Sequence, residues 1–143
     1  MLVRLIYCSR VRPTVSTLDV RSILTVSQRN NARDGITGGL VFTGGVFLQC
    51  LEGHRSAVNE TYHRIAADPR HFDPAILSWE EVDTRQFSAW TMGYLGYTSD
   101  NSALFLKYAA GKEFDPYACR SSAIREMFTE VVANAKILKP TVD

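Results

Sequence analysis

The fold of this chain is decided by residues 36–51, which read ITGGLVFTGGVFLQCL. Within this stretch two apolar runs, residues 36–42 and 46–51, flank the sequence Thr43-Gly44-Gly45. Paired glycines between two such runs suit the positive backbone angles of a tight hairpin turn. The stretch therefore predicts two antiparallel strands joined by a short loop.

Three further strands are predicted on either side of this hairpin. Residues 2–8 form a short apolar run that residues 9–13 interrupt, which indicates a strand buried on at least one face. Residues 75–82 and 91–97 have the composition of a fourth and a fifth strand. The hairpin is thus expected to belong to a larger sheet.

Two amphipathic helices are predicted between these strands. Apolar residues at three- and four-residue spacing predict one helix that starts behind a cap at Ser16 or Thr17 and ends near residues 30–31. The same spacing at Val58, Tyr62, Ile65 and Ala66 predicts a second helix that stops before Pro69. The resulting order is typical of an α+β, ferredoxin-like βαββαββ sheet with two helices on one face.

The last third of the chain, residues 98–143, is interpreted as a C-terminal helical extension of a domain that spans residues 1–97. Residues 99–107 predict a short helix. A clearer helix carries an apolar stripe formed by Ile124, Met127, Phe128, Val131, Val132 and Ala135. Because 143 residues is the length of one ordinary domain, the extension is not expected to be a separate domain.

The composition favours a globular, cytoplasmic protein with no strong charge preference for a partner. Hydrophobic residues make up 45% of the chain, charged residues 22%, and the formal net charge is +1. A basic stripe for nucleic acid and an apolar run of about 20 residues for a membrane span are both missing from the sequence. Neither nucleic acid nor a membrane is therefore expected as a partner.

Most catalytic and metal-binding classes find no support in the sequence. The three histidines, His54, His63 and His71, lack metal-ligand spacing with one another and with a cysteine. The glycine pairs do not form a phosphate-binding loop of the dinucleotide type. Cys8 and Cys50 lie in apolar, strand-like segments and are read first as small buried hydrophobes, with a catalytic thiol as the minority interpretation.

Gln49 is the unusual residue of the predicted hairpin. In a strand it alternates onto the same face as Phe47 and Leu51, so its amide is expected to be partly buried. A buried amide without a partner costs about 1–3 kcal/mol, so a polar group must meet it on that face. Tyr7 of the first strand is the obvious candidate, and a plain tyrosine–glutamine pair inside the core is the alternative without function.

Two further groups of polar residues have both a local and a functional interpretation. Asn30 and Asn31 can end a helix in the left-handed conformation, or they can present amides to a heterocycle. Arg64, Arg70 and His71 surround the end of the second helix, where cations complement the helix dipole or pair with a phosphate or a ring carbonyl.

Taken together, these segments resemble the BLUF family of blue-light sensors that use FAD. The resemblance follows the family's order over about the first 97 residues and is closest to short members without a fused output domain. It is carried by these stretches: residues 4–7 (RLIY), 27–31 (SQRNN), 34–38 (DGITG), 47–49 (FLQ), 51–53 (LEG), 58–65 (VNETYHRI), 68–71 (DPRH) and 90–92 (WTM).

The resemblance implies a flavin ring between the two helices, with Tyr7 as its electron and proton donor and Gln49 as the side chain whose hydrogen bonds rearrange. Trp90 and Met92 match two residues of the family that take alternative positions in relatives. The residues implied at the cofactor are Tyr7, Ile23, Asn30, Asn31, Gln49, Arg64, Ile65, Arg70 and His71.

The resemblance also implies an output path through the fifth strand and the C-terminal helices. The expected recipient is a homo-oligomer, a dimer or larger, or a separate response protein. Two alternatives stay open: a light-insensitive module that binds a flavin or another small ligand, and an enzyme that uses Cys8 or Cys50.

Overall fold

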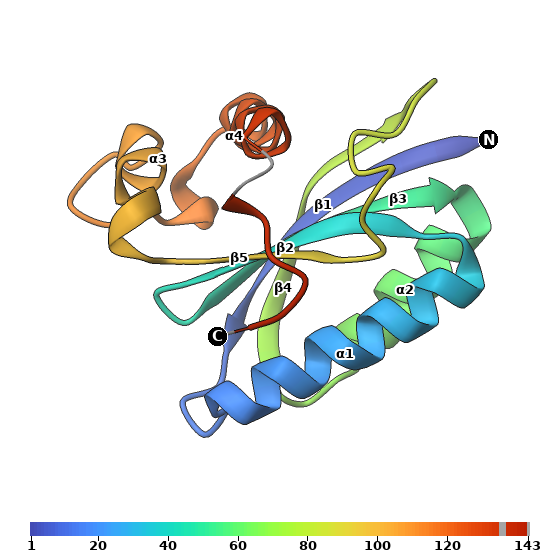
Figure 1. Cartoon of the computed structure of the whole chain (residues 1–143), viewed down its shortest axis with the longest axis horizontal. Helices are drawn as coiled ribbons and strands as arrows, with labels where there is room; N and C mark the ends of the chain where they lie inside the picture. The colour runs from blue at the N-terminus through green and yellow to red at the C-terminus, as the bar shows by residue number, and fades with distance from the viewer. Residues whose placement is uncertain (135–136, 143) are drawn as a thin grey trace.

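A five-stranded sheet lies between two layers of helices in the computed structural model of the chain (Figure 1). The structure describes residues 1–134 and 137–142. The strands lie side by side in the order β4-β1-β3-β2-β5, and all pairs are antiparallel except β2 with β5. Their bounds are β1 Leu2–Val11, β2 Thr37–Thr43, β3 Val46–His54, β4 His71–Glu81 and β5 Gly93–Gly96.

The helices divide between the two faces of this sheet. On one face lie α1, Thr17–Asp34, and α2, Arg55–Ala66, as the ferredoxin-like prediction requires. On the other lie the short α3, Ser102–Lys107, and α4, Ser121–Ala133. The predicted fold class is therefore confirmed, with the C-terminal helices packed on the second face of the same sheet.

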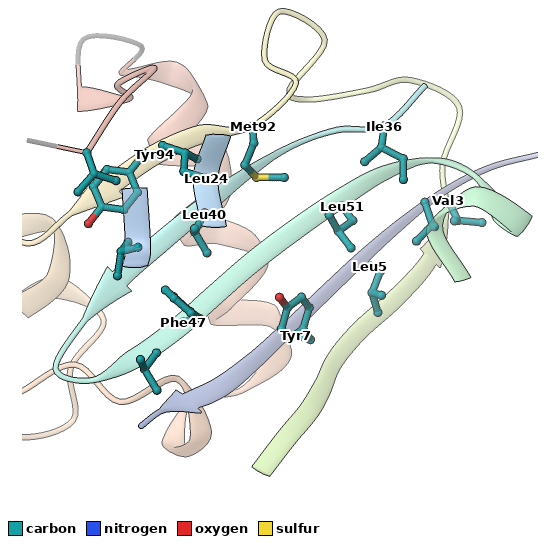
Figure 2. Packing of buried hydrophobic residues seen from close by; sticks show 14 residues of the cluster. Val3, Leu5, Tyr7, Leu24, Ile36, Leu40, Phe47, Leu51, Met92 and Tyr94 are labelled. Carbon is teal, nitrogen blue, oxygen red and sulfur yellow. The ribbon is translucent and has the colours of Figure 1, made fainter. Parts of the chain in front are cut away.

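The alternation of side chains along β1 separates two hydrophobic cores. Val3, Leu5 and Tyr7 belong to one core with residues of α1 and α2, and Figure 2 shows their side chains on β1 beside those of β3. Ile6 and Cys8 point the opposite way and pack against the α4 side. The buried stripe of α4 consists of Ile124, Met127, Phe128 and Val131, whereas Val132 is half-buried and Ala135 lies outside the described residues.

The glycine hairpin forms as the sequence predicts. Gly44 and Gly45 have φ angles of 58° and 73°, which residues with a side chain rarely adopt. The turn sets Phe42 opposite Phe47 and Leu40 opposite Gln49. The register of β2 on β3 follows from this turn.

Several predicted boundaries differ from those of the structure. β1 continues to Val11 since Arg10 and Val11 pair with β4. α1 continues past Asn30 and Asn31 to Asp34, and Gly35, with φ 70°, ends it in the left-handed conformation. The Asn pair is therefore not the helix cap.

The ends of the other elements also differ from the predictions. Strand β4 begins at His71 instead of residue 75, whereas α2, Arg55–Ala66, ends before Pro69 as predicted. Strand β5 is limited to residues 93–96, and residues 99–107 divide into a 3-10 turn followed by α3. Pro74 is accommodated within β4 because this strand forms an edge of the sheet.

A buried carboxylate ties β3 to the loop that precedes β5. Glu52 is fully buried and accepts a hydrogen bond of 2.8 Å from the Arg4 guanidinium. The same carboxylate accepts hydrogen bonds of 2.8 and 2.7 Å from the backbone N–H groups of Gln86 and Phe87. The Glu52 carboxylate thus accepts hydrogen bonds from three donors, and removing it leaves all three without this acceptor.

We expect Glu52→Ala to lower the free energy of unfolding by about 3–5 kcal/mol, because breaking a buried ion pair leaves its partner uncompensated. The matched control is Glu81→Ala, which removes the exposed partner of Arg55 and should cost less than about 1 kcal/mol. Urea unfolding followed by circular dichroism measures both values. Equal effects of the two variants would contradict the anchoring role of Glu52.

Candidate functional site

A cavity of about 150 Å³ opens between α1, α2 and the sheet. Its lining consists of Tyr7, Ile23, Val26, Ser27, Asn30, Asn31, Leu40, Phe47, Gln49, Thr61, Arg64, Ile65, Asp68, Arg70 and His71. Apolar walls with a small number of convergent polar groups are typical of a cofactor site.

All nine residues that the sequence resemblance implied at a cofactor lie in the wall of this cavity. Their role in binding a ligand stays a prediction. Six lining residues were missed: Val26, Ser27, Leu40, Phe47, Thr61 and Asp68. Phe47 and Leu40 could have been predicted at the cavity from the sequence pattern. Phe47 lies on the same face of its strand as Gln49, and Leu40 pairs with Gln49 across the hairpin.

Tyr7 and Gln49 meet at the floor of the cavity. They lie directly opposite each other in the β1–β3 pair, and both are almost fully buried. The Tyr7 hydroxyl donates a hydrogen bond to the Gln49 side-chain oxygen. Burial raises the pKa of Tyr7 far above its ordinary value, with smaller contributions from Tyr62 and Asp68, so the phenol keeps its proton.

The other end of the Gln49 amide faces Met92. Gln49 Nε2 donates to the Met92 sulfur at 3.4 Å, and Met92 is fully buried on the α1 side of the sheet. Trp90 is half-buried and packs with the opposite core, next to Gly93. Of the two residues that the resemblance singled out, Met92 is therefore the one in contact with Gln49.

Asn31 is held in place at the polar end of the cavity. It is buried, and its Nδ2 donates to the carbonyl oxygen of Thr91 at 2.8 Å. This bond fixes the amide plane and leaves the side-chain oxygen as an acceptor for a second donor. Asn30, one residue earlier on α1, is half-buried and also lines the cavity.

Charged residues stand where the cavity meets solvent. The exposed Arg70 binds Asp68 through two guanidinium nitrogens at 3.0 and 2.5 Å, and this pairing lowers the pKa of Asp68. Arg64 lies 3.7 Å from Asp34. These guanidinium groups can exchange a surface ion pair for a ligand phosphate at low cost, because exposed pairs contribute about 0–1 kcal/mol.

His71 is committed to structure at the inner wall. Its Nε2 donates to the carbonyl oxygen of Ile65 at 2.5 Å, and its Nδ1 lies 2.7 Å from the hydroxyl of Ser9. The ring therefore joins β4 to both β1 and the end of α2. His71 supports the shape of the cavity from two sides.

The thiols lie on the wrong face of the sheet for chemistry in this cavity. Cys8 and Cys50 belong to the core under α4. Burial raises the pKa of Cys8 to about 11, and burial also raises the pKa of Cys50. Both thiols are held in the protonated, unreactive form, which argues against a thiol-dependent enzyme.

The donor set of the cavity fits a flavin. Ile23 of α1 and Ile65 of α2 both line the cavity and can pack on a flat ring. The side-chain amides of Asn31 and Gln49 can form hydrogen bonds with the carbonyl and ring-nitrogen edge of the flavin. Gln49 Nε2 donates to the Met92 thioether, a weak acceptor that a flavin atom can replace. Within residues 1–134 and 137–142 there is no group of three metal-ligating side chains.

Residues 2–93 match the family model described as "BLUF: Sensors of blue-light using FAD". Over 92 residues, or 64% of this chain, the sequence is 38% identical to photoactivated adenylate cyclase subunit beta of Euglena gracilis. Over 87 residues it is 33% identical to the blue light- and temperature-regulated antirepressor BluF of Escherichia coli (strain K12). The alignments span 11% and 22% of these two relatives, so they cover one part of larger proteins.

Solved structures of similar length share the whole fold. The photo-activated state of BlsA aligns with a TM-score of 0.83 and 30% identity over 92% of this chain and 95% of that chain. BlrB, a BLUF protein in its dark state, aligns with a TM-score of 0.82 and 32% identity over 93% and 96%. None of the helices in the described residues combines the length and apolar character needed to span a bilayer.

We expect Ile65→Trp to abolish flavin uptake, because the indole fills the space between α1 and α2 while the surrounding fold keeps its other contacts. The apparent affinity for FAD should fall at least about tenfold. The matched control is Ile76→Trp on exposed β4, which should bind flavin as the wild type does. Flavin-to-protein absorbance after gel filtration measures the outcome, and normal loading of Ile65→Trp would place the flavin elsewhere.

Proposed function

Since the chain belongs to the BLUF family, the sensors of blue light using FAD, we propose that its light response is a rearrangement of the Gln49 amide that Tyr7 drives. The observation that carries this proposal is the Tyr7–Gln49 hydrogen bond in the wall of the cavity. FAD is the cofactor of the family. Ile23, Ile65, Asn31 and the residues around them would hold its ring.

When bound, the flavin absorbs blue light and its excited state accepts an electron. Tyr7 is placed to supply it, because the phenol lines the cavity and its raised pKa keeps the proton on the oxygen until the electron leaves. Electron loss makes the phenol strongly acidic, so the proton moves along its hydrogen bond to Gln49. When the electron and the proton return, Tyr7 is restored to its starting state.

Gln49 retains the change after Tyr7 has recovered. A primary amide has an acceptor end and a donor end. One rotation of the Gln49 amide therefore places its nitrogen next to Tyr7 and its oxygen next to Met92. In the structure the oxygen accepts from Tyr7 and the nitrogen donates to the Met92 sulfur. In the turned amide the oxygen faces the sulfur, which has no proton to donate. The resting orientation is therefore favoured by one hydrogen bond.

We assign the chain a sensory role without catalytic turnover. BlsA and BlrB, which it covers almost end to end, give the architectural precedent. The described titratable groups of the cavity are occupied in ion pairs or structural hydrogen bonds, as with Arg70 and His71. We further propose that residues 1–97 form the flavin module and that residues 98–143 extend it toward an output.

The output is proposed to reach a homo-oligomer or a separate response protein. The name of the Escherichia coli relative describes an antirepressor, and that of the Euglena gracilis relative describes a cyclase subunit. These outputs differ, although the matched segment is similar in both. We infer that residues 2–93 supply the light response and that the remainder of each protein selects the recipient.

We expect Gln49→Leu to bind FAD but to lose the reversible red shift of the flavin absorption under blue light. Leucine keeps the volume of the side chain and removes both ends of the amide. The control is Gln86→Leu, since the Gln86 amide donates to Thr129 of α4 on the opposite side of the sheet and the variant should shift normally. Absorption spectra before and after illumination measure both, and an unchanged shift in Gln49→Leu would refute the assigned switch.

The same spectra separate the sensor from its main rival. A light-insensitive flavin-binding module would give a yellow wild-type protein whose absorption does not change under blue light. A protein that remains colourless with excess FAD would contradict both the photoreceptor and the flavin-binding module, and would favour another ligand for the cavity.

We expect Met92→Leu to slow the return from the red-shifted to the resting state by about two- to tenfold, because it removes the hydrogen bond that favours the resting orientation of Gln49. Met127→Leu is the matched control, since Met127 is equally buried but lies in the α4 core. The decay of the red shift in the dark gives the rate. A faster or unchanged return of Met92→Leu would argue that the sulfur does not bias Gln49.

A further inference from the structure

The C-terminal end of the chain crosses the outer edge of the sheet. Figure 1 shows this segment, in red, passing from the α4 side across β5 toward α1. Lys139 pairs with Tyr94 of β5 through two backbone hydrogen bonds, with N–O distances of 2.7 and 2.8 Å. Residues 138–142 therefore act as a short strap along the edge strand, and they are called the C-terminal strap below.

Helix α1 holds the far end of the C-terminal strap. The Gln28 side chain donates to the carbonyl oxygen of Pro140 at 2.7 Å, and the Arg21 guanidinium donates to that of Val142 at 2.9 Å. Leu138 and Val142 are buried, the first in the α4 core and the second in the α1–α2 core. The strap thus touches both layers of the molecule.

Gln28 also reaches the segment that holds the photoactive methionine. Its Nε2 donates to the carbonyl oxygen of Met92 at 3.0 Å, as well as to that of Pro140. An amide nitrogen has two hydrogens, so these two carbonyl groups use its full donor capacity. One side chain therefore fixes the backbone of Met92 and the strap at the same time.

We propose that Gln28 is a positioning residue that couples the Gln49–Met92 contact to the C-terminal strap, an inference that rests on the proposed light response. The path contains three steps: Gln49 Nε2 to Met92 sulfur, Met92 carbonyl to Gln28 Nε2, and Gln28 Nε2 to the Pro140 carbonyl. When Gln49 turns, the Met92 sulfur loses its donor, while the Met92 carbonyl stays bound to Gln28. Gln28 passes the resulting shift to the strap.

The geometry explains why a small shift is enough. Hydrogen bonds weaken steeply when the donor–acceptor distance or angle leaves a narrow range. Because both bonds of Gln28 share one nitrogen, this nitrogen cannot follow a displaced Met92 carbonyl without leaving Pro140. Loss of the second bond weakens the strap next to its pairing with Tyr94, which makes local opening of the edge easier.

The test compares Gln28→Glu with Gln28→Lys in the full chain. Glutamate is isosteric but turns the donor end into an acceptor that repels both carbonyl groups, whereas lysine retains donors at a similar reach. We expect Gln28→Glu to speed amide hydrogen exchange of Tyr94 and Lys139 about tenfold in the dark and to slow dark recovery of the flavin spectrum severalfold. Gln28→Lys should restore both toward wild type. Gln86→Glu, at a side chain that donates to Thr129 of α4, is the matched control.

The second part of the test measures amide hydrogen exchange under blue light. In the wild type, blue light should speed exchange of the Lys139 amide, and in Gln28→Glu light should add no further increase. Unchanged amide exchange and unchanged dark recovery in Gln28→Glu would overturn the proposed coupling. Amide exchange that rises equally throughout β1 and β3 would also overturn it, because such a rise indicates general destabilisation. A wild type without any red shift would instead refute the proposed function, while the dark exchange comparison still decides whether Gln28 clamps the strap.

Discussion

The antiparallel register of β1 on β3 is the constraint on which the rest of this molecule depends. It sets Tyr7 opposite Gln49 and directs both side chains to the face that α1 and α2 cover. A slip of β3 by one residue would turn Gln49 to the α4 core and bring Cys50 to the face that Tyr7 occupies. The fully buried Glu52 on β3, bound to Arg4 of β1, fixes this register by an interaction that no neighbouring register reproduces.

The two faces of the sheet serve different purposes because of that register. Under α4 the sheet carries a core of aliphatic and aromatic side chains, in which the rings of Phe87 and Phe128 meet edge to face. The α1–α2 face leaves a cavity between the helices, with polar side chains placed at its floor and mouth. A close-packed layer behind the sheet gives β1 and β3 a rigid support, so a change at Gln49 is more easily accommodated toward Met92 and β5 than into the opposite core.

Much of the site could be predicted from the sequence, because it depends on local patterns. The alternation in β3 identified Gln49 as a buried amide, and the glycine hairpin fixed its strand pairing. What the sequence did not reveal depends on contacts distant in the chain. The placement of Met92 inside and Trp90 outside follows from how residues 90–92 cross to the edge of the sheet. The end of α1 is an exception, because the cap at Gly35 is a local signal that the prediction did not use. The strap at residues 138–142 carries no strand pattern of its own and is defined by its partners on β5 and α1.

Three side-chain amides converge on the short segment that leads into β5. Asn31 holds the Thr91 carbonyl, Gln28 holds the Met92 carbonyl, and Gln49 contacts the Met92 sulfur. The first two restrain the backbone from α1, and only the third comes from the strand that also carries the bond to Tyr7. Because a restraint by hydrogen bonds is lost within a small displacement, a segment held in this way moves between discrete positions instead of drifting. The entrance to β5 is therefore the point at which a change of one amide in a buried cavity can become a change of the molecular surface.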